Sequence, residues 1–483
     1  MGFVVLAVQA HYTQLRPFPC KDVAPSATSH CESATRSQEA ILFTGLYLVA
    51  LGTGGIKAAL PSLGADQFDE QDSRESTSLS SFFNWLMFSI TFGAILGVTF
   101  VVWISSNLGW DWAFGVCAVA VTMGLLFLSM GLSIYQKYLP KGSPLVRILQ
   151  VFVAAMRKWR LPVPDMATEL HEVHDKELQN EILQRTDQFK CLDHAAIVTP
   201  EDGPVLSAYS GSWKLCTVTQ IEETKILVRM LPIILSTVFM NTCLAQLQTF
   251  SIQQSTTMNR KIGSFEVPGP SVPVIPLLFM FILLPIYDRI FIPIARKFTG
   301  IPTGITKLQR VGVGLVLSAI SMAVSGLIET RRKNVAIEHG MVDSPGPLPV
   351  SVFWLGIQYA IFGMADMFTL AGMLDFFYAE SSSGMKSLST AISWCSLAFG
   401  YYTSTVVVSV VNKVSKGWLE SNNLNRDRLE YFYWLLSGVS VLNFGLYLVC
   451  ARWYKYKIVQ DQKSRLDHIQ DSIDVSVGKN STP

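Results

Sequence analysis

The sequence predicts an all-α protein that crosses a membrane several times. Half of its 483 residues are hydrophobic and only 15% are charged, whereas a soluble domain carries roughly 25% charged residues. Apolar stretches of about twenty residues, the length needed to cross a bilayer core of about 30 Å, recur along the chain. The net charge of +2 gives no reason to expect a nucleic-acid partner. The partner that the composition implies is the lipid bilayer.

The spans are predicted from length and apolar content. Residues 1–10, "MGFVVLAVQA", are apolar but only half a span long. They lack the basic start of a signal peptide, and Leu6 stands where myristoylation needs Ser or Thr. We therefore expect the end of a helix whose beginning is absent. Full spans are expected at about 40–60, 81–104, 111–135, 226–249, 271–295, 306–329, 348–373, 387–411 and 429–453.

The predicted spans fall into two groups. Residues 1–135 hold the short stretch and three spans, and predict an incomplete N-terminal bundle. Residues 226–457 hold six spans and predict a C-terminal bundle. A polar central loop at 136–225 and a tail at 458–483 are expected to be cytoplasmic. Two helix bundles joined by a long loop are typical of transporters, and the unequal halves predict that roughly two helices are missing from the first.

The charge distribution supports this orientation. With the central loop and C-terminus inside, the inner segments carry about twice as many Lys and Arg residues as the outer ones, as the positive-inside rule requires. The basic stretch "TRRKN" at 330–334 falls on the outer side and does not fit the rule.

One helix is expected within the central loop, at about 143–160. Ser143 is a suitable N-cap, and Pro144 occupies the first helical position. The segment is too short and too charged to span a bilayer. Its apolar content and basic end predict a helix lying on the inner leaflet; the alternative is a solvated helix.

Enzyme and metal signatures are absent from the sequence. "GTGG" at 52–55 does not continue as a dinucleotide-binding motif, "HEVHD" at 171–175 is not HExxH, and there is no P-loop. The eight cysteines form no CxxC pair. We therefore expect no enzymatic activity, no metal and no cofactor. Cys20 and Cys31 share one polar loop, where they either form a disulfide or remain free thiols.

Two opposite charges near mid-depth are the main candidates for function. Lys57 lies in the apolar run "LGTGGIKAAL", and Asp366 lies in "IFGMADMFTL". A charge at the bilayer centre costs at least about 2.5–3.5 kcal/mol, so such residues usually face a cavity and pair. We predict that the two pair across the bundles and act as a gate or coupling pair. A purely structural pair is the alternative.

Other charged residues lie near the inner ends of spans. Arg229 is either an anchor that snorkels to the interface or a functional charge. Asp288 is expected to be satisfied by its own turn, for example by Arg289.

Polar and aromatic residues in the later spans are candidates for a substrate pocket. We expect Gln246, Gln358, Tyr359 and Trp394 to line it. The alternative for each is hydrogen bonding or packing between helices.

Several segments resemble one family closely. "ALGTGGIKAALPSLGADQFDE", "YDRIFIPIAR", "LQRVGVGLVLS" and "LDFFYAESSSGMKSLSTA" resemble the plant nitrate and peptide transporter family, proton-coupled oligopeptide-type transporters of the major facilitator superfamily. The likeness covers nearly the whole chain. "CLAQLQTFSIQQ" and "ADMFTLAGMLDFF" are most similar to the branch with abscisic-acid and low-affinity nitrate transporters.

The resemblance implies twelve helices with both ends inside, of which this chain lacks roughly the first two. It places Lys57 on the fourth helix and its acidic partner on the tenth, at Asp366, in agreement with the pairing above. The ExxER motif of the family's first helix is absent here. Nitrate-carrying members use a histidine at the position of Leu244, so its replacement favours an organic substrate.

These observations predict proton-coupled symport of a small anion or organic acid: nitrate, abscisic acid or a related hormone, or a small peptide. The mechanism expected is alternating access driven by the proton gradient, with the plasma membrane as location. The alternative is a truncated, non-transporting membrane protein that regulates full-length transporters by associating with them. On either reading we expect impaired transport by the chain as given.

Overall fold

The computed structural model describes residues 1–17, 34–68, 73–136, 143–164, 169–172, 183–199, 213–262, 265–267, 269–301, 304–344, 346–382, 385–415, 417–421 and 423–456. Cys20 and Cys31, the candidate disulfide, lie outside these residues. The described part is mostly helical, with four short strands. Nine of its helical segments are long and apolar enough to cross a membrane, and they confirm the nine predicted spans.

The chain divides into two compact units. The first, here called the helical unit, comprises Met1–Lys137, Leu235–Asp375 and Thr390–Leu448. The second, the loop unit, comprises Tyr138–Ile234, Phe376–Ser389 and Val449–Pro483. Both predicted bundles contribute to the helical unit. The predicted central loop forms most of the loop unit, together with the connection after residue 375 and the residues after 448.

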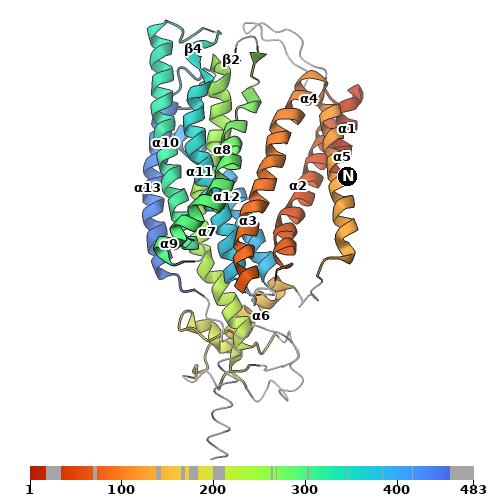
Figure 1. Ribbon diagram of the computed structural model, residues 1–483, viewed down its shortest axis with the longest axis vertical. Helices are drawn as coiled ribbons and strands as arrows, with labels where there is room; N and C mark the ends of the chain where they lie inside the picture. Colours follow the sequence, from red (N-terminus) through yellow and green to blue (C-terminus); the bar gives the residue numbers. More distant parts are fainter. Residues whose placement is uncertain are drawn as a thin grey trace, which may run out of the picture. The chain divides into compact units, whose positions relative to one another are not determined.

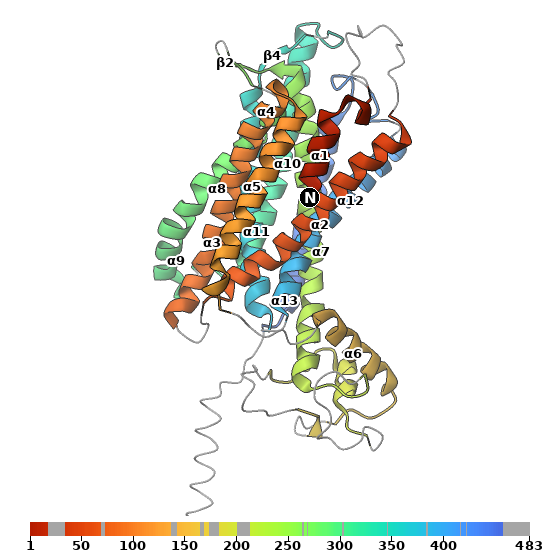
Figure 2. The ribbon, with the colours of Figure 1, turned by 90° about the vertical axis from the view of Figure 1, so that its right-hand side faces the viewer.

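The N-terminal helices of the helical unit pack closely. The short helix α1 (Gly2–His11) lies against α2 (Arg36–Ala65) and α5 (Trp110–Met130) (Figure 2). A Cβ added at Gly2 would come within 2.7 Å of Val49. This close approach of α1 to α2 therefore requires a residue without a side chain, and such small residues are common where membrane helices touch.

Two π-helical segments interrupt long apolar helices. The segment η2 (Gly97–Val101) joins α3 (Ser73–Leu96) to α4 (Val102–Asn107). The segment η9 (Tyr287–Phe291) joins α8 (Val274–Ile286) to α9 (Ile292–Thr299). Since π-helical turns frequently occur at functional sites, and α3 packs against α8, this helix pair is a candidate region for function.

The remaining long helices are α7 (Val218–Thr257), α10 (Lys307–Glu338), α11 (Leu355–Glu380), α12 (Lys386–Ser415) and α13 (Leu429–Trp453). Figure 1 shows α10 and α11 side by side, joined by Ser321 Oγ, which donates to the Gln358 carbonyl at 2.8 Å. Capping by Thr306, whose hydroxyl accepts from the Gln309 amide at 3.2 Å, begins α10.

Short strands join the ends of helices. β1 (Met258–Asn259), which directly follows α7, pairs in parallel with β4 (Leu348–Ser351). β2 (Lys261–Ile262) pairs with β3 (Phe265–Glu266) in an antiparallel hairpin. Because β4 leads through η10 (Val352–Trp354) into α11, the β1–β4 pairing holds the end of α7 beside the start of α11.

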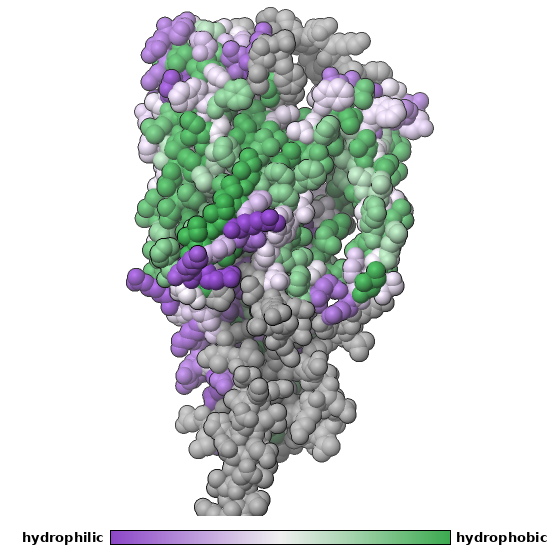
Figure 3. Space-filling view, viewed as in Figure 1, coloured by the Kyte–Doolittle hydropathy of each residue, from purple (hydrophilic) through white to green (hydrophobic). Residues whose placement is uncertain are grey.

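The outward surface of these helices is apolar. Figure 3 shows hydrophobic residues over most of the visible helical surface, with hydrophilic residues gathered near its ends. Large side chains such as Tyr402, Leu442 and Leu125 are more than half exposed. Exposed apolar surface of this extent is typical of helices that contact lipid.

The helix predicted at 143–160 is present as α6 (Pro144–Arg157), with Ser143 at its N-cap and proline at its start. Its buried face, including Val151 and Ala154, packs in a small apolar core with Leu192 and Ile221. Its other face leaves Leu145, Leu149, Phe152 and Met156 exposed, and Trp159, just beyond its end, is exposed too. The position on the inner leaflet stays a prediction.

Buried charges organise the start of α7 within the loop unit. Lys225 Nζ lies 2.6 Å from Asp193 and 2.8 Å from Glu222, and Arg229 lies 3.2 Å from Glu222. These side chains are at most 3% exposed. Arg229 is therefore a member of a buried ion-pair cluster, and snorkelling to an interface does not describe it.

Candidate functional site

The helical unit contains a cavity of about 270 Å³. Four helices and the turn before α8 supply its wall, which is apolar apart from an amide, a phenol and a carboxyl group. The lining residues are Ala94 and Val98 of the α3–η2 segment, Leu244, Leu247 and Gln248 of α7, Pro273, Pro276, Leu277 and Met280 in and just before α8, and Tyr359, Phe362, Gly363 and Asp366 of α11. A small, mostly apolar cavity with few polar groups is the usual form of a small-molecule site.

Three residues singled out from the sequence lie in this wall: Leu244, Tyr359 and Asp366. Asp366 is the carboxylate of the cavity. Within the described ranges, no side chain donates a hydrogen bond to Asp366 or forms an ion pair with it. Its acidic group is therefore available to a proton or to a ligand.

Lys57 and Trp394, also singled out from the sequence, contact each other. The Lys57 ammonium lies 4.3 Å from the centroid of the Trp394 ring, a distance at which the cation is attracted to the ring face. Lys57 makes no ion pair with Asp366 among the described residues. The predicted pair of opposite charges thus stays a prediction, and Trp394 holds the lysine in this conformation.

Gln246 and Gln358 join helices, which is the alternative that the sequence left open. Gln246 Nε2 donates to Ser404 Oγ at 2.7 Å and links α7 to α12. Gln358 Nε2 donates to Ser251 Oγ at 2.9 Å and links α11 to α7. Neither lies in the cavity wall.

Several residues of the cavity wall were not predicted from the sequence. Gln248 supplies the amide of the cavity and accepts a hydrogen bond from the Tyr401 hydroxyl. Its position four residues after Leu244 places both on one face of α7, and this spacing was the available signal. The apolar wall from α3 and α8 gave no signal, since any lipid-facing residue of those helices looks the same in sequence.

A polar cluster joins α3 to α8 and α10. Asp288 accepts from Ser81 Oγ and from Asn84 Nδ2, both at 2.9 Å. The Asn84 side-chain oxygen accepts from Arg310 Nη2 at 2.9 Å. The expectation that Asp288 is satisfied by its own turn is wrong, because its partners lie on α3, about two hundred residues away.

The cluster lies on one side of the cavity. Along α3, Asn84 precedes the wall residue Ala94 by ten residues, and along α8 and η9, Asp288 follows Met280 by eight. At 1.5 Å per residue, the separation is roughly 12–15 Å. Phe88 and Phe281 stack between the same helices with ring centroids 4.3 Å apart. On the predicted inner side of the cavity, α3 and the α8–η9 segment are thus joined by an aromatic contact and a polar cluster.

No group of three or more His, Cys, Asp or Glu side chains within the described part of the chain is arranged to hold a metal ion.

Comparison with known proteins gives a family. The model of the POT family matches residues 1–424. The chain is 45% identical to the protein NRT1/PTR FAMILY 4.5 of Arabidopsis thaliana over 467 residues, covering 94% of this chain and 79% of the relative. It is 43% identical to NRT1/PTR FAMILY 4.6 of the same plant over 487 residues, covering 95% and 80%.

Solved structures show the same fold at lower identity. An auto-inhibited POT family peptide transporter matches with a TM-score of 0.58 and 17% identity, over 88% of this chain and 79% of that one. The POT family transporter PepTSo matches with a TM-score of 0.53 and 18% identity, over 86% and 79%. Together with the nine apolar helices among the described residues, these matches lead to one conclusion. The chain belongs to the POT family, a family of proton-coupled, multi-pass membrane transporters of the major facilitator type.

Proposed function

We propose that this protein is a proton-coupled symporter of a small organic acid or anion, and that it works by alternating access across the plasma membrane. The observation that carries the proposal is the cavity, whose wall combines helices of the first and second groups and contains one carboxyl group, Asp366. A carboxyl group that can bind both a proton and a substrate can couple the binding of one to the binding of the other.

The wall favours an organic substrate over nitrate. Leu244 stands at the position where the resemblance implies a nitrate-binding histidine, and most of the wall is apolar. An apolar wall lowers the free energy of a carbon skeleton by removing it from water, but it offers nitrate no donor. A weak acid such as abscisic acid, a related hormone or a small peptide therefore fits the cavity better.

The coupling that we propose uses Asp366 and Lys57 in turn. With Asp366 ionised, its charge attracts Lys57 away from Trp394, and the pair closes the cavity between the two groups of helices. When Asp366 takes up a proton, the attraction is lost and Lys57 returns to the Trp394 ring. Opening to the inner side additionally requires that the contacts of Asp288 with Ser81 and Asn84 break.

The test is uptake into proteoliposomes with an imposed pH gradient. Labelled abscisic acid, nitrate and a dipeptide are each offered at acidic outer pH, with the gradient collapsed by a protonophore as control. We expect gradient-dependent uptake of an organic solute, at an impaired rate in the chain as given, and little uptake of nitrate. Uptake that is equal with and without the gradient would overturn the proposed coupling, and preferential uptake of nitrate would overturn the substrate class. No contact among the described residues favours the alternative of a non-transporting regulator.

A further inference from the structure

Within the outer basic stretch that did not fit the orientation, Arg332 is buried and Lys333 is half-buried. Arg332 and its ion-pair partner Glu329, both on α10, have 0% exposed side chains. Lys333 pairs with Glu430 of α13 at 3.0 Å, and Arg331 lies 4.0 Å from the centroid of the Trp354 ring. Arg331, Arg332 and Lys333 therefore make contacts within the helical unit.

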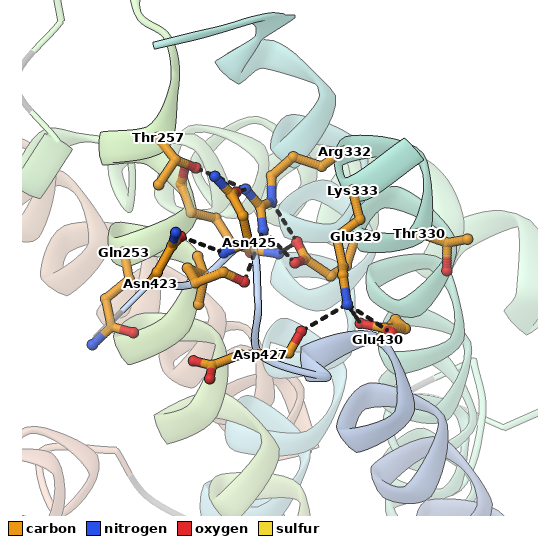
Figure 4. A network of polar contacts seen from close by, with 12 residues as sticks. Gln253, Thr257, Glu329, Thr330, Arg332, Lys333, Asn423, Asn425, Asp427 and Glu430 are labelled. Atoms are coloured by element: carbon orange, nitrogen blue, oxygen red, sulfur yellow. Dashed lines mark hydrogen bonds and ion pairs between the residues drawn. The ribbon is translucent and has the colours of Figure 1, made fainter. Parts of the chain in front are cut away.

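All five N–H groups of Arg332 are used, as Figure 4 shows in part. Nε and Nη2 donate to the two Glu329 oxygens at 2.8 and 2.6 Å. Nη1 donates to Thr257 Oγ1 at 3.1 Å and to the Asn425 side chain at 2.5 Å, and Nη2 also donates to the Leu424 carbonyl at 3.4 Å. A lysine has three donors and no planar fork, so it cannot replace this arginine.

The pair continues into a ladder of hydrogen bonds along α7. Gln254 Nε2 donates to Glu329 Oε2 at 2.6 Å. One turn earlier, Ser251 Oγ accepts from Gln358 of α11 at 2.9 Å. A further turn earlier, the Leu247 carbonyl accepts from the Tyr359 hydroxyl at 3.4 Å. Positions 247, 251 and 254 have the spacing of a single helix face.

The last rung of this ladder is part of the cavity wall, because Leu247 and Tyr359 both line the cavity. The first rung is a fully buried ion pair. Removing one partner of such a pair destabilises the protein strongly, because the other charge stays buried without a counter-charge. Tyr433 of α13 also donates to Gln254, at 3.4 Å. The contacts at the Arg332 end therefore contribute to the rotation of α7 about its axis, together with the Gln246–Ser404 contact to α12.

We infer that Arg332 and Glu329 are positioning residues: through Gln254 and Ser251 they hold the α7 and α11 faces that form the substrate cavity. They touch no cavity atom themselves. The effect on substrate affinity rests on the proposed transport function, whereas the ladder itself does not.

The test compares Arg332→Lys and Glu329→Gln with Arg426→Ala as matched control. Arg426 forms an exposed ion pair with Asp343 at 2.8 Å. This pair contacts none of Glu329, Gln254 and Ser251, and it reaches Arg332 only indirectly, through Asn423 and Asn425. For abscisic acid uptake per inserted molecule, we expect the first two variants to raise KM about tenfold with little change in Vmax. The control should keep both values. A fall in Vmax at unchanged KM would mean a loss of folded protein and would overturn the inference.

Ser251→Ala keeps the test valid if the α10 variants fold poorly. It removes one rung with little change in volume and should raise KM on its own. Combined with Glu329→Gln, its effect should be less than the product of the two single effects, because both interrupt one ladder. Independent, multiplicative effects would contradict the ladder.

A readout without substrate separates the two proposals. Cys243 of α7 is fully buried and contacts Ser440 of α13 at 3.6 Å. Its alkylation by N-ethylmaleimide, followed by peptide mass spectrometry, reports how firmly α7 is held. We expect faster alkylation in Arg332→Lys than in the wild type and Arg426→Ala. Equal rates in all three would overturn the ladder. Failure of wild-type uptake with this difference present would overturn the transport function alone.

Discussion

At the scale of single residues, two charges within the spans differ from the others. Arg310 and Arg332 have carboxylate or amide partners at 2.9 Å or less. Among the residues that the structure describes, Lys57 contacts the Trp394 ring and no acid, and Asp366 faces a cavity. A charge held without a partner of opposite sign within a membrane span is costly, and this cost makes the two residues candidates for function.

Removing either charge should stop coupled uptake. We expect Lys57→Ala and Asp366→Ala to lower pH-gradient-driven uptake to background, because each variant lacks one half of the proposed pair. Asp366→Asn, which imitates the protonated acid, should still exchange substrate across the membrane without a gradient. Transport assays in proteoliposomes check this, and gradient-driven uptake at the normal rate in either alanine variant would eliminate the pair.

Leu244 offers a residue-scale test of substrate choice. Leu244→His places a hydrogen-bond donor in a wall that is otherwise mostly apolar. We expect nitrate uptake to rise relative to that of the organic acid by about tenfold, the ratio that one charge-assisted hydrogen bond of roughly 1.5 kcal/mol produces. Competition between the two labelled solutes measures this ratio. An unchanged ratio would mean that position 244 does not contact the substrate.

At the scale of elements, π-helical segments and polar clusters determine where helices touch. The η9 segment carries Asp288 to Ser81 and Asn84 of α3, and the first turns of α7 carry Lys225 to Asp193. Neither contact follows from helical periodicity. The first contact joins residues about two hundred positions apart in the chain, and the second joins the start of α7 to Asp193, 32 residues earlier.

The α3–η9 contact should control access from the inner side. Asn84→Leu removes the amide that bridges Asp288 and Arg310 and leaves the buried Arg310 without this acceptor, a loss of roughly 1–3 kcal/mol. We expect the inner side to open more often. Alkylation of a cysteine introduced at Met280 in the cavity wall, by a membrane-impermeant reagent added from the inner side, should become faster. Ser89→Ala, an exposed position on the same helix, is the control. Slower labelling would contradict a closing role.

The buried charge cluster of the loop unit should dominate that unit's stability. Lys225→Met removes the cation shared by Asp193 and Glu222, which keep Arg185 and Arg229 as partners. The expected loss is therefore that of hydrogen bonds to charged groups, roughly 1.5–3 kcal/mol. The exposed pair Lys190–Asp187 provides the control, since Lys190→Ala should change stability by less than about 1 kcal/mol. Limited proteolysis across a urea series, read at the loop-unit peptides, compares the two. Equal effects would show that the cluster adds no stability.

The exposed stripe of α6 allows its predicted position to be checked. A spin label at Met156→Cys should be shielded from a water-soluble relaxant in vesicles containing anionic lipid, because the stripe and the basic end of the helix favour such a surface. A label at Asp187→Cys, which is 89% exposed, should remain accessible. Equal accessibility at both positions would place α6 in water.

At the scale of the whole molecule, much followed from the sequence alone. The spans, α6 and the family were predictable, because length, hydropathy and short motifs are local properties of the chain. The cost of a charge in lipid also singled out Lys57 and Asp366, whose role stays a prediction. For Gln246 and Gln358 the sequence left two possibilities, lining a pocket or hydrogen bonding between helices, and the second is the one observed.

Only the tertiary structure decided which side chains meet. Trp394 as the partner of Lys57, Ser81 and Asn84 as the partners of Asp288, and Gln254 as the link between Arg332 and the cavity depend on the rotation of each helix about its axis. That rotation is set by packing against helices distant in sequence, and a pattern that is apolar on all sides does not encode it. The sequence alone determined that charges lie within the spans, and helix packing determined the partners they have there.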